Sequence, residues 1–191
     1  MREKRFNLVH RLIHWAIALT FSFLLLTILL RMGWMNKDGM GEIIQKNLGK
    51  FGAEISKADA GTIGKAVRRP MWSWHVIAGY VLIGLYVIRM AITVTQGIAY
   101  QNPLSKDTPL KERFKSWVYI VFYLLVAVSL FTGFMIENGP KDLQKNMEFV
   151  HVKSLYYLFA FIFIHLSGVF LADAGPERGI ISRMISGDRK D

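Results

Sequence analysis

The sequence predicts an all-α integral membrane protein that folds as a four-helix transmembrane bundle. Three observations lead to this class. The 191 residues are 52% hydrophobic with a mean hydropathy of +0.29, too apolar for a disordered nucleic-acid-binding segment despite a net charge of +10. Four uncharged stretches each approach the roughly 20 helical residues that cross about 30 Å of hydrocarbon. The absence of cysteine excludes disulfides, thiolate zinc sites, iron–sulfur clusters and covalently attached haem.

Each expected element follows from one apolar stretch. We expect spans at about residues 9–31, 71–94, 116–136 and 151–172 of a single membrane domain covering 1–191. The first stretch is too long for a cleaved signal peptide and lacks a small-residue cleavage site, so we expect it to be retained. Four spans place both termini on one side. That side is expected to be the cytoplasm, because much of the opposite side's basic charge lies in the middle of the longest connection, away from span ends.

The longest connection, residues 32–70, is expected on the periplasmic side. It holds seven of the 16 glycines, which favours short elements joined by turns. Apolar residues recur among charged ones at nearly helical spacing, and this predicts a short amphipathic helix on the bilayer or against a partner: Ile43, Ile44, Leu48, Phe51 and Ile55. A proline at residue 70 fits the first turn of the helix that follows.

Four of the five histidines lie within or at the edges of spans, where an ionisable side chain is costly and marks a candidate functional site. His151 and His165 are 14 residues apart, so on one continuous helix they share a face and lie about 21 Å apart along its axis. Under the predicted topology His75 is level with His151, and His14 is level with His165. Such pairs suit two haem irons, stacked across the bilayer, that each take two imidazole ligands.

Other residues bear on this interpretation. Gly79 and Gly168 lie one turn beyond His75 and His165, where a small residue lets a macrocycle lie flat on the helix. A lone intramembrane histidine often only hydrogen-bonds a neighbouring helix. A zinc or proton-transport site is a further alternative, although such metal sites usually add carboxylates and the apolar stretches contain none. His10 is either an alternative ligand or an interfacial group near a haem propionate or a quinone head group.

Several segments resemble the bacterial di-haem cytochrome b superfamily. They are RLIHW at Arg11–Trp15, WHVIAGYVLIGLYVIR at Trp74–Arg89, TGF at Thr132–Phe134, the histidine spacing of 14 in the fourth span, and RGIISRMISGDR at Arg178–Arg189. The superfamily includes the cytochrome b subunits of nickel-iron hydrogenases and formate dehydrogenases, and stand-alone cytochrome b561 proteins. The resemblance covers all four spans, and the tail is most similar to the hydrogenase subunits. The first connection is longer than in the shorter members.

The resemblance implies two haem b groups, one held by His14 and His165 on the cytoplasmic side and one by His75 and His151 on the periplasmic side. It also implies electron transfer between a periplasmic redox partner, such as a hydrogenase, and the quinone pool of a bacterial inner membrane. A quinone site near the cytoplasmic haem directs attention to amide side chains at Gln96, Gln101 and Asn102. Haem propionates are expected to pair with cations, although these also suit snorkelling to lipid head groups: Arg11 on one side, and Arg68, Arg69 and Lys153 on the other.

Three functional hypotheses follow. The first is an electron-transfer subunit, with no catalytic side chain beyond the haem ligands, docked to a periplasmic redox subunit. The second is a stand-alone superoxide:quinone oxidoreductase of the cytochrome b561 type, for which a cationic outer surface would attract the substrate. The third is a helical scaffold or transporter that uses its histidines without haem. Nothing in the sequence decides whether the chain forms a homo-oligomer.

Overall fold

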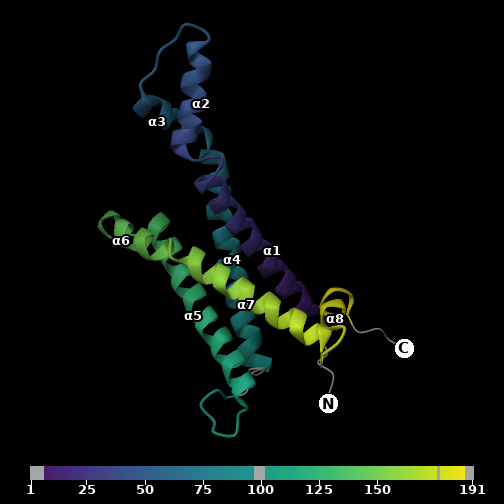
Figure 1. Ribbon diagram of the computed structural model, residues 1–191. Helices are drawn as coiled ribbons and strands as arrows, with labels where there is room; N and C mark the ends of the chain where they lie inside the picture. The colour runs from purple at the N-terminus through teal and green to yellow at the C-terminus, as the bar shows by residue number, and fades with distance from the viewer. Residues whose placement is uncertain (1–6, 97–101, 176, 188–191) are drawn as a thin grey trace. The chain divides into compact units, whose positions relative to one another are not determined.

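The computed structural model describes residues 7–96, 102–175 and 177–187, and these residues contain helices and no strand (Figure 1). Four segments are long and apolar enough to cross a membrane: Leu8–Met32, Arg69–Thr95, Leu110–Asn138 and Lys141–Ala174. Each contains one of the spans predicted from the sequence. The predicted all-α, multi-pass membrane fold is therefore confirmed.

The chain divides into two units, Ala18–Leu82 and the combination of Met1–Ile17 with Ile83–Asp191. Two long helices, α1 (Leu8–Met32) and α4 (Arg69–Gln96), contribute residues to both units. Pro70 is the second residue of α4, in the first turn, where its missing backbone N–H leaves no hydrogen bond unmade.

The unit Ala18–Leu82 contains a helical hairpin between its two span segments. The hairpin consists of α2 (Lys37–Gly49) and α3 (Lys57–Val67), which lie side by side beyond the ends of α1 and α4 (Figure 1). Side chains cap both helix starts: the Asn36 Oδ1 accepts the Gly39 N–H at 2.8 Å, and the Ser56 Oγ accepts the Asp59 N–H at 3.1 Å. These caps satisfy backbone donors that the first turn of a helix leaves without a partner.

This hairpin differs from the expected turn-rich connection. The predicted amphipathic helix is α2, but it ends at Gly49, so Phe51 and Ile55 lie outside it. The second helix, α3, was not predicted, because its short sequence contains two glycines and only two large apolar residues, Ile63 and Val67. Gly41 and Gly64 lie inside these helices at the contact between α2 and α3, where a Cβ on either would lie 3.1 Å from an atom of the facing helix. These two glycines allow close helix packing rather than turns.

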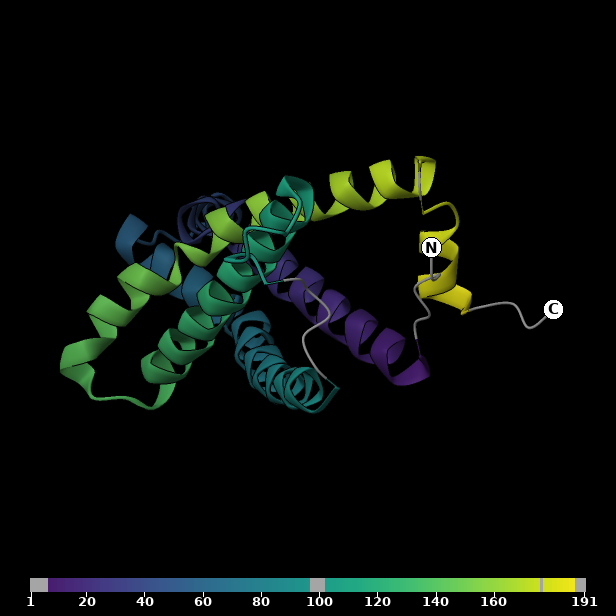
Figure 2. The ribbon, with the colours of Figure 1, turned by 90° about the horizontal axis from the view of Figure 1, so that it is seen from below.

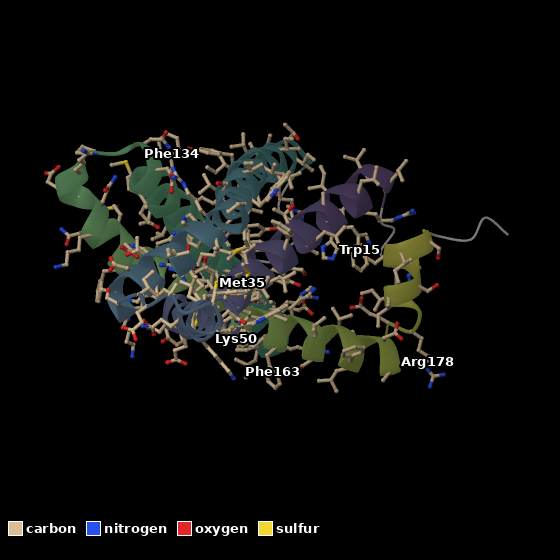
Figure 3. The ribbon with its side chains drawn as sticks, turned by 90° about the horizontal axis from the view of Figure 1, so that it is seen from above. Trp15, Met35, Lys50, Phe134, Phe163 and Arg178 are labelled. Atoms are coloured by element: carbon tan, nitrogen blue, oxygen red, sulfur yellow. The ribbon has the colours of Figure 1, made fainter. Side chains whose placement is uncertain are left out.

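The other unit holds α5 (Leu110–Asn138), α6 (Lys141–His151), α7 (Ser154–Ala174) and α8 (Ile180–Ser186). Gly139 and Pro140 join α5 to α6, and the two helices fold back on each other (Figure 2). The rings of Phe122 in α5 and Phe161 in α7 are stacked. The short helix α8 turns back from the end of α7 (Figure 2). The Trp15 Nε1–H donates to the carbonyl of Met184 in α8 at 3.1 Å, and Figure 3 shows the position of Trp15 on α1.

The fourth span is not the single uninterrupted helix expected over 151–172. It is built from α6, which ends on His151, and α7, which begins at Ser154. Val152 and Lys153 keep right-handed helical dihedrals, but the backbone tightens there, since the N–H of Lys153 bonds to the carbonyl of Val150 at 3.1 Å. The Ser154 hydroxyl caps the freed carbonyl of His151 at 2.6 Å. His151 and His165 therefore lie on two consecutive helices, which corrects the prediction of one helix.

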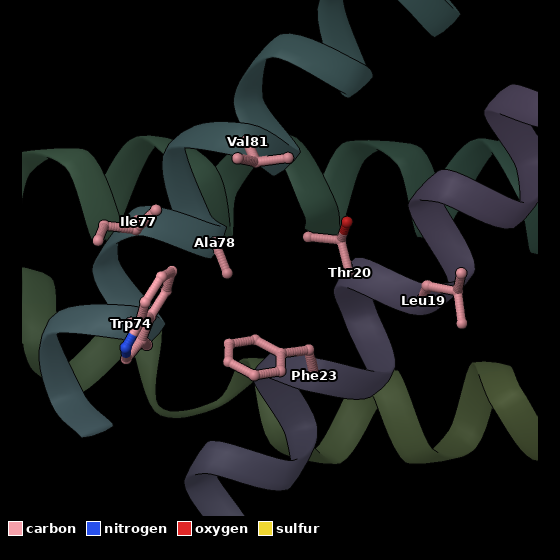
Figure 4. Close-up of a pocket in the computed structure, with 7 residues that line it drawn as sticks. All are labelled: Leu19, Thr20, Phe23, Trp74, Ile77, Ala78 and Val81. Carbon is pink, nitrogen blue, oxygen red and sulfur yellow. The ribbon is translucent and has the colours of Figure 1, made fainter. Parts of the chain in front are cut away.

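An apolar groove of about 550 Å³ lies between α1 and α4 within the unit Ala18–Leu82. Figure 4 shows Phe23 of α1 facing Trp74 and Ala78 of α4 across it. Its lining is aliphatic or aromatic apart from one hydroxyl: Leu19, Thr20, Phe23, Trp74, Ile77, Ala78 and Val81. The groove therefore offers apolar surface and little hydrogen bonding.

Candidate functional site

His14 of α1 and His165 of α7 are brought together by the first and last spans. Their ring centroids are 6.1 Å apart and their planes are inclined by 45°. An imidazole nitrogen lies about 2 Å from a bound metal, so two rings at this separation would leave room for one metal atom between them. His14 and His165 could therefore together hold a haem iron, which would supply one-electron chemistry.

Aromatic side chains of two helices hold His165 in place. Its ring stacks on Phe161, one turn earlier in α7, with centroids 5.5 Å apart and planes inclined by 12°. Tyr119 of α5 meets the ring edge-on, and its hydroxyl lies 3.3 Å from the His165 Nδ1. Trp15 contacts the neighbouring His14 ring in an edge-to-face arrangement at 5.5 Å. Such contacts restrict the ring orientations of both histidines.

His151 is anchored to α5 through its Nδ1. This nitrogen lies 3.0 Å from the carbonyl oxygen of Ser129 and 3.2 Å from the Thr132 hydroxyl. A carbonyl only accepts, so the proton is on Nδ1 and the Nε2 lone pair is left for a metal. A Cβ on Gly133 would lie 2.9 Å from the His151 Cε1. Only glycine at this position lets the imidazole approach the α5 backbone so closely.

His75 of α4 is held in the same way by α1, within the unit Ala18–Leu82. The Thr27 Oγ1 lies 2.7 Å from the His75 Nδ1 and donates its own proton to the Leu24 carbonyl at 2.6 Å. The single hydroxyl proton is thereby used, so the threonine oxygen accepts from Nδ1–H. His75 also stacks on Trp72, with ring centroids 4.7 Å apart, and the Arg31 guanidinium lies over the Trp72 ring at 4.4 Å. The proposed pairing of His75 with His151 remains a prediction.

His10 has the opposite hydrogen-bonding role. The Arg89 Nη1 lies 3.0 Å from the His10 Nδ1, and the Arg89 Nε donates to the Tyr123 hydroxyl at 3.2 Å. A guanidinium only donates, so the His10 Nδ1 accepts, and a neutral His10 carries its proton on Nε2. An Nε2 that carries a proton has no lone pair for iron. The geometry therefore favours His14 over His10 as the ligand on α1.

Arg11 has a buried nitrogen without a partner. Its Nε is one of three such side-chain atoms in the described residues, with those of Arg113 and Arg183. The Arg11 guanidinium fills the space where a Cβ on Gly187 would lie, and Gly187 adopts a φ of +85°. An unpaired buried guanidinium nitrogen one turn from His14 fits the role predicted for Arg11, which is to receive an anionic group such as a haem propionate.

The glycines predicted to face a macrocycle have room beside them. A Cβ built on either Gly79 or Gly168 meets no heavy atom within 4 Å. A flat group can therefore approach either helix backbone. The open space beside these glycines, the imidazole nitrogens that could bind a metal and the unpartnered Arg11 Nε are each compatible with haem binding.

The other residues predicted to pair with haem propionates or to bind quinone lie in several parts of the chain. The Arg68 Nη1 donates to the carbonyl of Met35 at 3.3 Å, at the base of the α2–α3 hairpin, and Arg69 is exposed. The Lys153 Nζ lies over the Phe149 ring at 4.9 Å. The Asn102 Oδ1 accepts the Leu104 N–H at 3.0 Å, which stabilises a turn. Gln101 lies outside the described residues, as does the side chain of the residue at position 96.

Several residues around the histidines were not identified from the sequence. Thr27 and Tyr119 carry no spacing signal, because their partners lie on other spans. Thr132 and Gly133 were noted only as part of a TGF motif, without a role. Arg89 was noted only as the end of another motif, and its contact with the first span requires the tertiary fold.

Comparison with known families gives one match over nearly the whole chain. The model of the family described as prokaryotic cytochrome b561 matches residues 5–187, which include all four spans and the four span histidines. Comparison with curated proteins and with solved structures gave no match. The family match agrees with the helical membrane fold and with the imidazole donors described above. The chain belongs to the prokaryotic cytochrome b561 family, and it is a haem b-binding membrane cytochrome with a role in electron transfer.

Proposed function

We propose that the protein carries two haem b groups and transfers electrons between a periplasmic redox partner, such as a hydrogenase, and the membrane quinone pool. The observation that supports this proposal most directly is the proximity of His14 and His165, whose ring centroids lie 6.1 Å apart although the residues belong to two different spans. His75 and His151 are proposed as the second ligand pair. Haem, when bound, supplies one-electron redox chemistry. The protein's part is to hold the ligands in the correct tautomer and to exclude water.

Support for the ligand assignment comes from the ring nitrogens. The Nδ1 of both His75 and His151 is engaged by an oxygen of a neighbouring helix, which directs Nε2 away from that helix. Histidines that bind metals commonly donate their second ring N–H to such an acceptor. Arg11, with its orphaned buried Nε, is proposed to pair with a propionate of the haem held by His14 and His165.

The partner sites follow from the proposed topology. With both termini in the cytoplasm of a bacterial cell, the α2–α3 hairpin and α6 lie on the periplasmic side of the inner membrane. We propose this face as the docking surface for a redox subunit. Gln101, with its neighbours at positions 96 and 102, stays our proposal for the quinone site on the opposite side.

Purification of the full chain in mild detergent tests the proposal. A dithionite-reduced spectrum is expected to show b-type bands, with two haems per chain by pyridine haemochrome assay. His14→Ala and His75→Ala are each expected to lose one haem and to keep the other. A chain without b-type bands would refute the assignment.

The purified preparation also separates the two haem-dependent functions. Co-purification of a periplasmic redox subunit supports the electron-transfer subunit. A haem-replete protein that purifies without such a subunit and oxidises superoxide would instead identify the stand-alone superoxide:quinone oxidoreductase.

A further inference from the structure

Thr27 and Thr132 are buried residues on otherwise exposed spans. The two residues are 2% and 3% exposed, whereas many large apolar residues of the spans are exposed. Each hydroxyl contacts the Nδ1 of one proposed haem ligand, Thr27 that of His75 at 2.7 Å and Thr132 that of His151 at 3.2 Å. The same side-chain chemistry therefore occurs at both ligands of one proposed pair.

Both contacts place Nδ1–H against a strong acceptor. The Thr27 oxygen is polarised by its own bond to the Leu24 carbonyl, and the Nδ1 of His151 also donates to the Ser129 carbonyl at 3.0 Å. Donation from Nδ1–H makes the imidazole more basic at Nε2 and stabilises the oxidised form of a bound metal. Hydrogen bonding around the ligands is one of the factors that set the potential of haem iron.

The contacts of the other proposed pair are weaker in the described residues. The Nδ1 of His165 lies 3.3 Å from the Tyr119 hydroxyl, farther than Thr27 lies from His75. For His14, the contacts found in the described part of the chain are aromatic, with Trp15 and with His165. Among the described residues, polarisation is therefore stronger at His75 and His151 than at His14 and His165.

We propose that Thr27 and Thr132 are positioning residues that lower the reduction potential of the iron bound by His75 and His151 below that of the iron bound by His14 and His165. This inference rests on the proposed function, because it requires two haems with these ligand pairs. The two potentials then lie in the order that favours electron movement from the periplasmic face toward the quinone side.

Redox titration of the purified full chain, followed at the b-type bands, tests this inference. The wild-type protein is expected to titrate in two steps. Thr27→Val and Thr132→Val preserve the β-branched shape but remove the hydroxyl, and each is expected to shift the lower step to higher potential while the upper step stays in place. His14→Ala, which retains only the His75/His151 haem, is expected to show the lower step alone.

Matched variants separate hydrogen bonding from packing. Thr95→Val removes a hydroxyl of α4 that, within the described part of the chain, bonds to the carbonyls of Ala91 and Ile92, and both steps are expected to remain at wild-type potentials. Thr27→Ser and Thr132→Ser keep the hydroxyl and are expected to keep the lower potential. If a valine variant loses haem, the serine variant at the same position decides the question. An equal loss of haem in the serine variant would overturn the role of the hydroxyl.

Two other outcomes are informative. Unchanged potentials in both valine variants, or a shift of the upper step instead of the lower, would overturn the inference and leave the di-haem function intact. A wild-type protein without b-type bands would overturn both.

Discussion

The two histidines at the start of α1, His10 and His14, share a helical face but differ in what their rings contact. His10 accepts a hydrogen bond from the Arg89 guanidinium, whereas His14 faces the ring of His165. Sequence spacing alone left either residue open as the ligand, because residues four apart lie on one face. Arginine only donates hydrogen bonds, and this property distinguishes the two histidines. The distinction depends on the contact between His10 and Arg89 of α4, which the sequence alone does not reveal.

A His10→Ala variant tests this distinction. It is expected to retain both haems, because the His14 and His165 rings are unchanged. It should also be less stable by about 1.5–3 kcal/mol, because the charged Arg89 guanidinium loses the His10 Nδ1 as its hydrogen-bond acceptor. Haem stoichiometry and thermal unfolding measure the two effects. Loss of one haem in this variant, with both haems retained in His14→Ala, would exchange the roles of the two histidines.

Gly133→Ala tests the close approach of His151 to α5. The added methyl group would lie 2.9 Å from the His151 Cε1, so the ring must move. We expect a destabilisation of about 1–3 kcal/mol, typical of overpacking, and loss of one haem. The matched control is Gly84→Ala in α4, where a Cβ meets nothing within 4 Å. Equal haem content in the two variants would argue against a close-approach role for Gly133.

Sequence reasoning at the residue scale found the candidate ligands more readily than the residues around them. His14 and His165 were paired by depth, and in the structure their ring centroids lie 6.1 Å apart, while their role as ligands stays a prediction. Thr27 was overlooked, because a threonine in an apolar span has no pattern that distinguishes it from others. Its role depends on which helix lies beside it, and that is a tertiary property.

The α2–α3 hairpin shows how glycine can be misinterpreted at the element scale. Glycine-rich sequence suggests turns, since glycine destabilises a helix interior by roughly 0.5–1 kcal/mol relative to alanine. Here Gly41 and Gly64 are buried in the contact between the two helices. Close packing of the helix backbones offsets the lower helix propensity.

Gly64→Ala is expected to open this hairpin. A Cβ at Gly64 would lie 3.1 Å from both the Lys37 carbonyl oxygen and the Met40 Cβ, so α3 must shift away from α2. Faster amide hydrogen exchange across residues 37–67 would report the change. Gly61→Ala, whose Cβ meets nothing within 4 Å, serves as the control and should leave exchange equal or slower. The same exchange rates in both variants would contradict the packing role of Gly64.

The interruption between α6 and α7 marks a limit of periodicity arguments. Val152 and Lys153 contain neither glycine nor proline, and their dihedrals stay helical. The interruption arises from a shift to i−3 hydrogen bonds and from the Ser154 hydroxyl on the His151 carbonyl. Such local exchanges of partner leave no signature in hydrophobic spacing.

At the scale of the whole molecule, the absence of cysteine provides a clean test of orientation. A single cysteine can be introduced at Lys46, on the exposed surface of α2, or at Lys106, in the connection between α4 and α5. With cytoplasmic termini, a membrane-impermeant maleimide applied to spheroplasts should label Lys46→Cys and spare Lys106→Cys. The reverse pattern would invert the proposed topology and exchange the faces assigned to the partner and the quinone.

The approach of His14 to His165 also has a consequence for biosynthesis. A polytopic chain is made from its N-terminus, so early spans are available before late ones. His75 and its threonine are both present once two spans exist, and His151 meets its partners on α5 as soon as α6 has emerged. The His14 ring must wait for α7. This site is therefore the last to be completed, and haem capture there would report that translation has passed the final span.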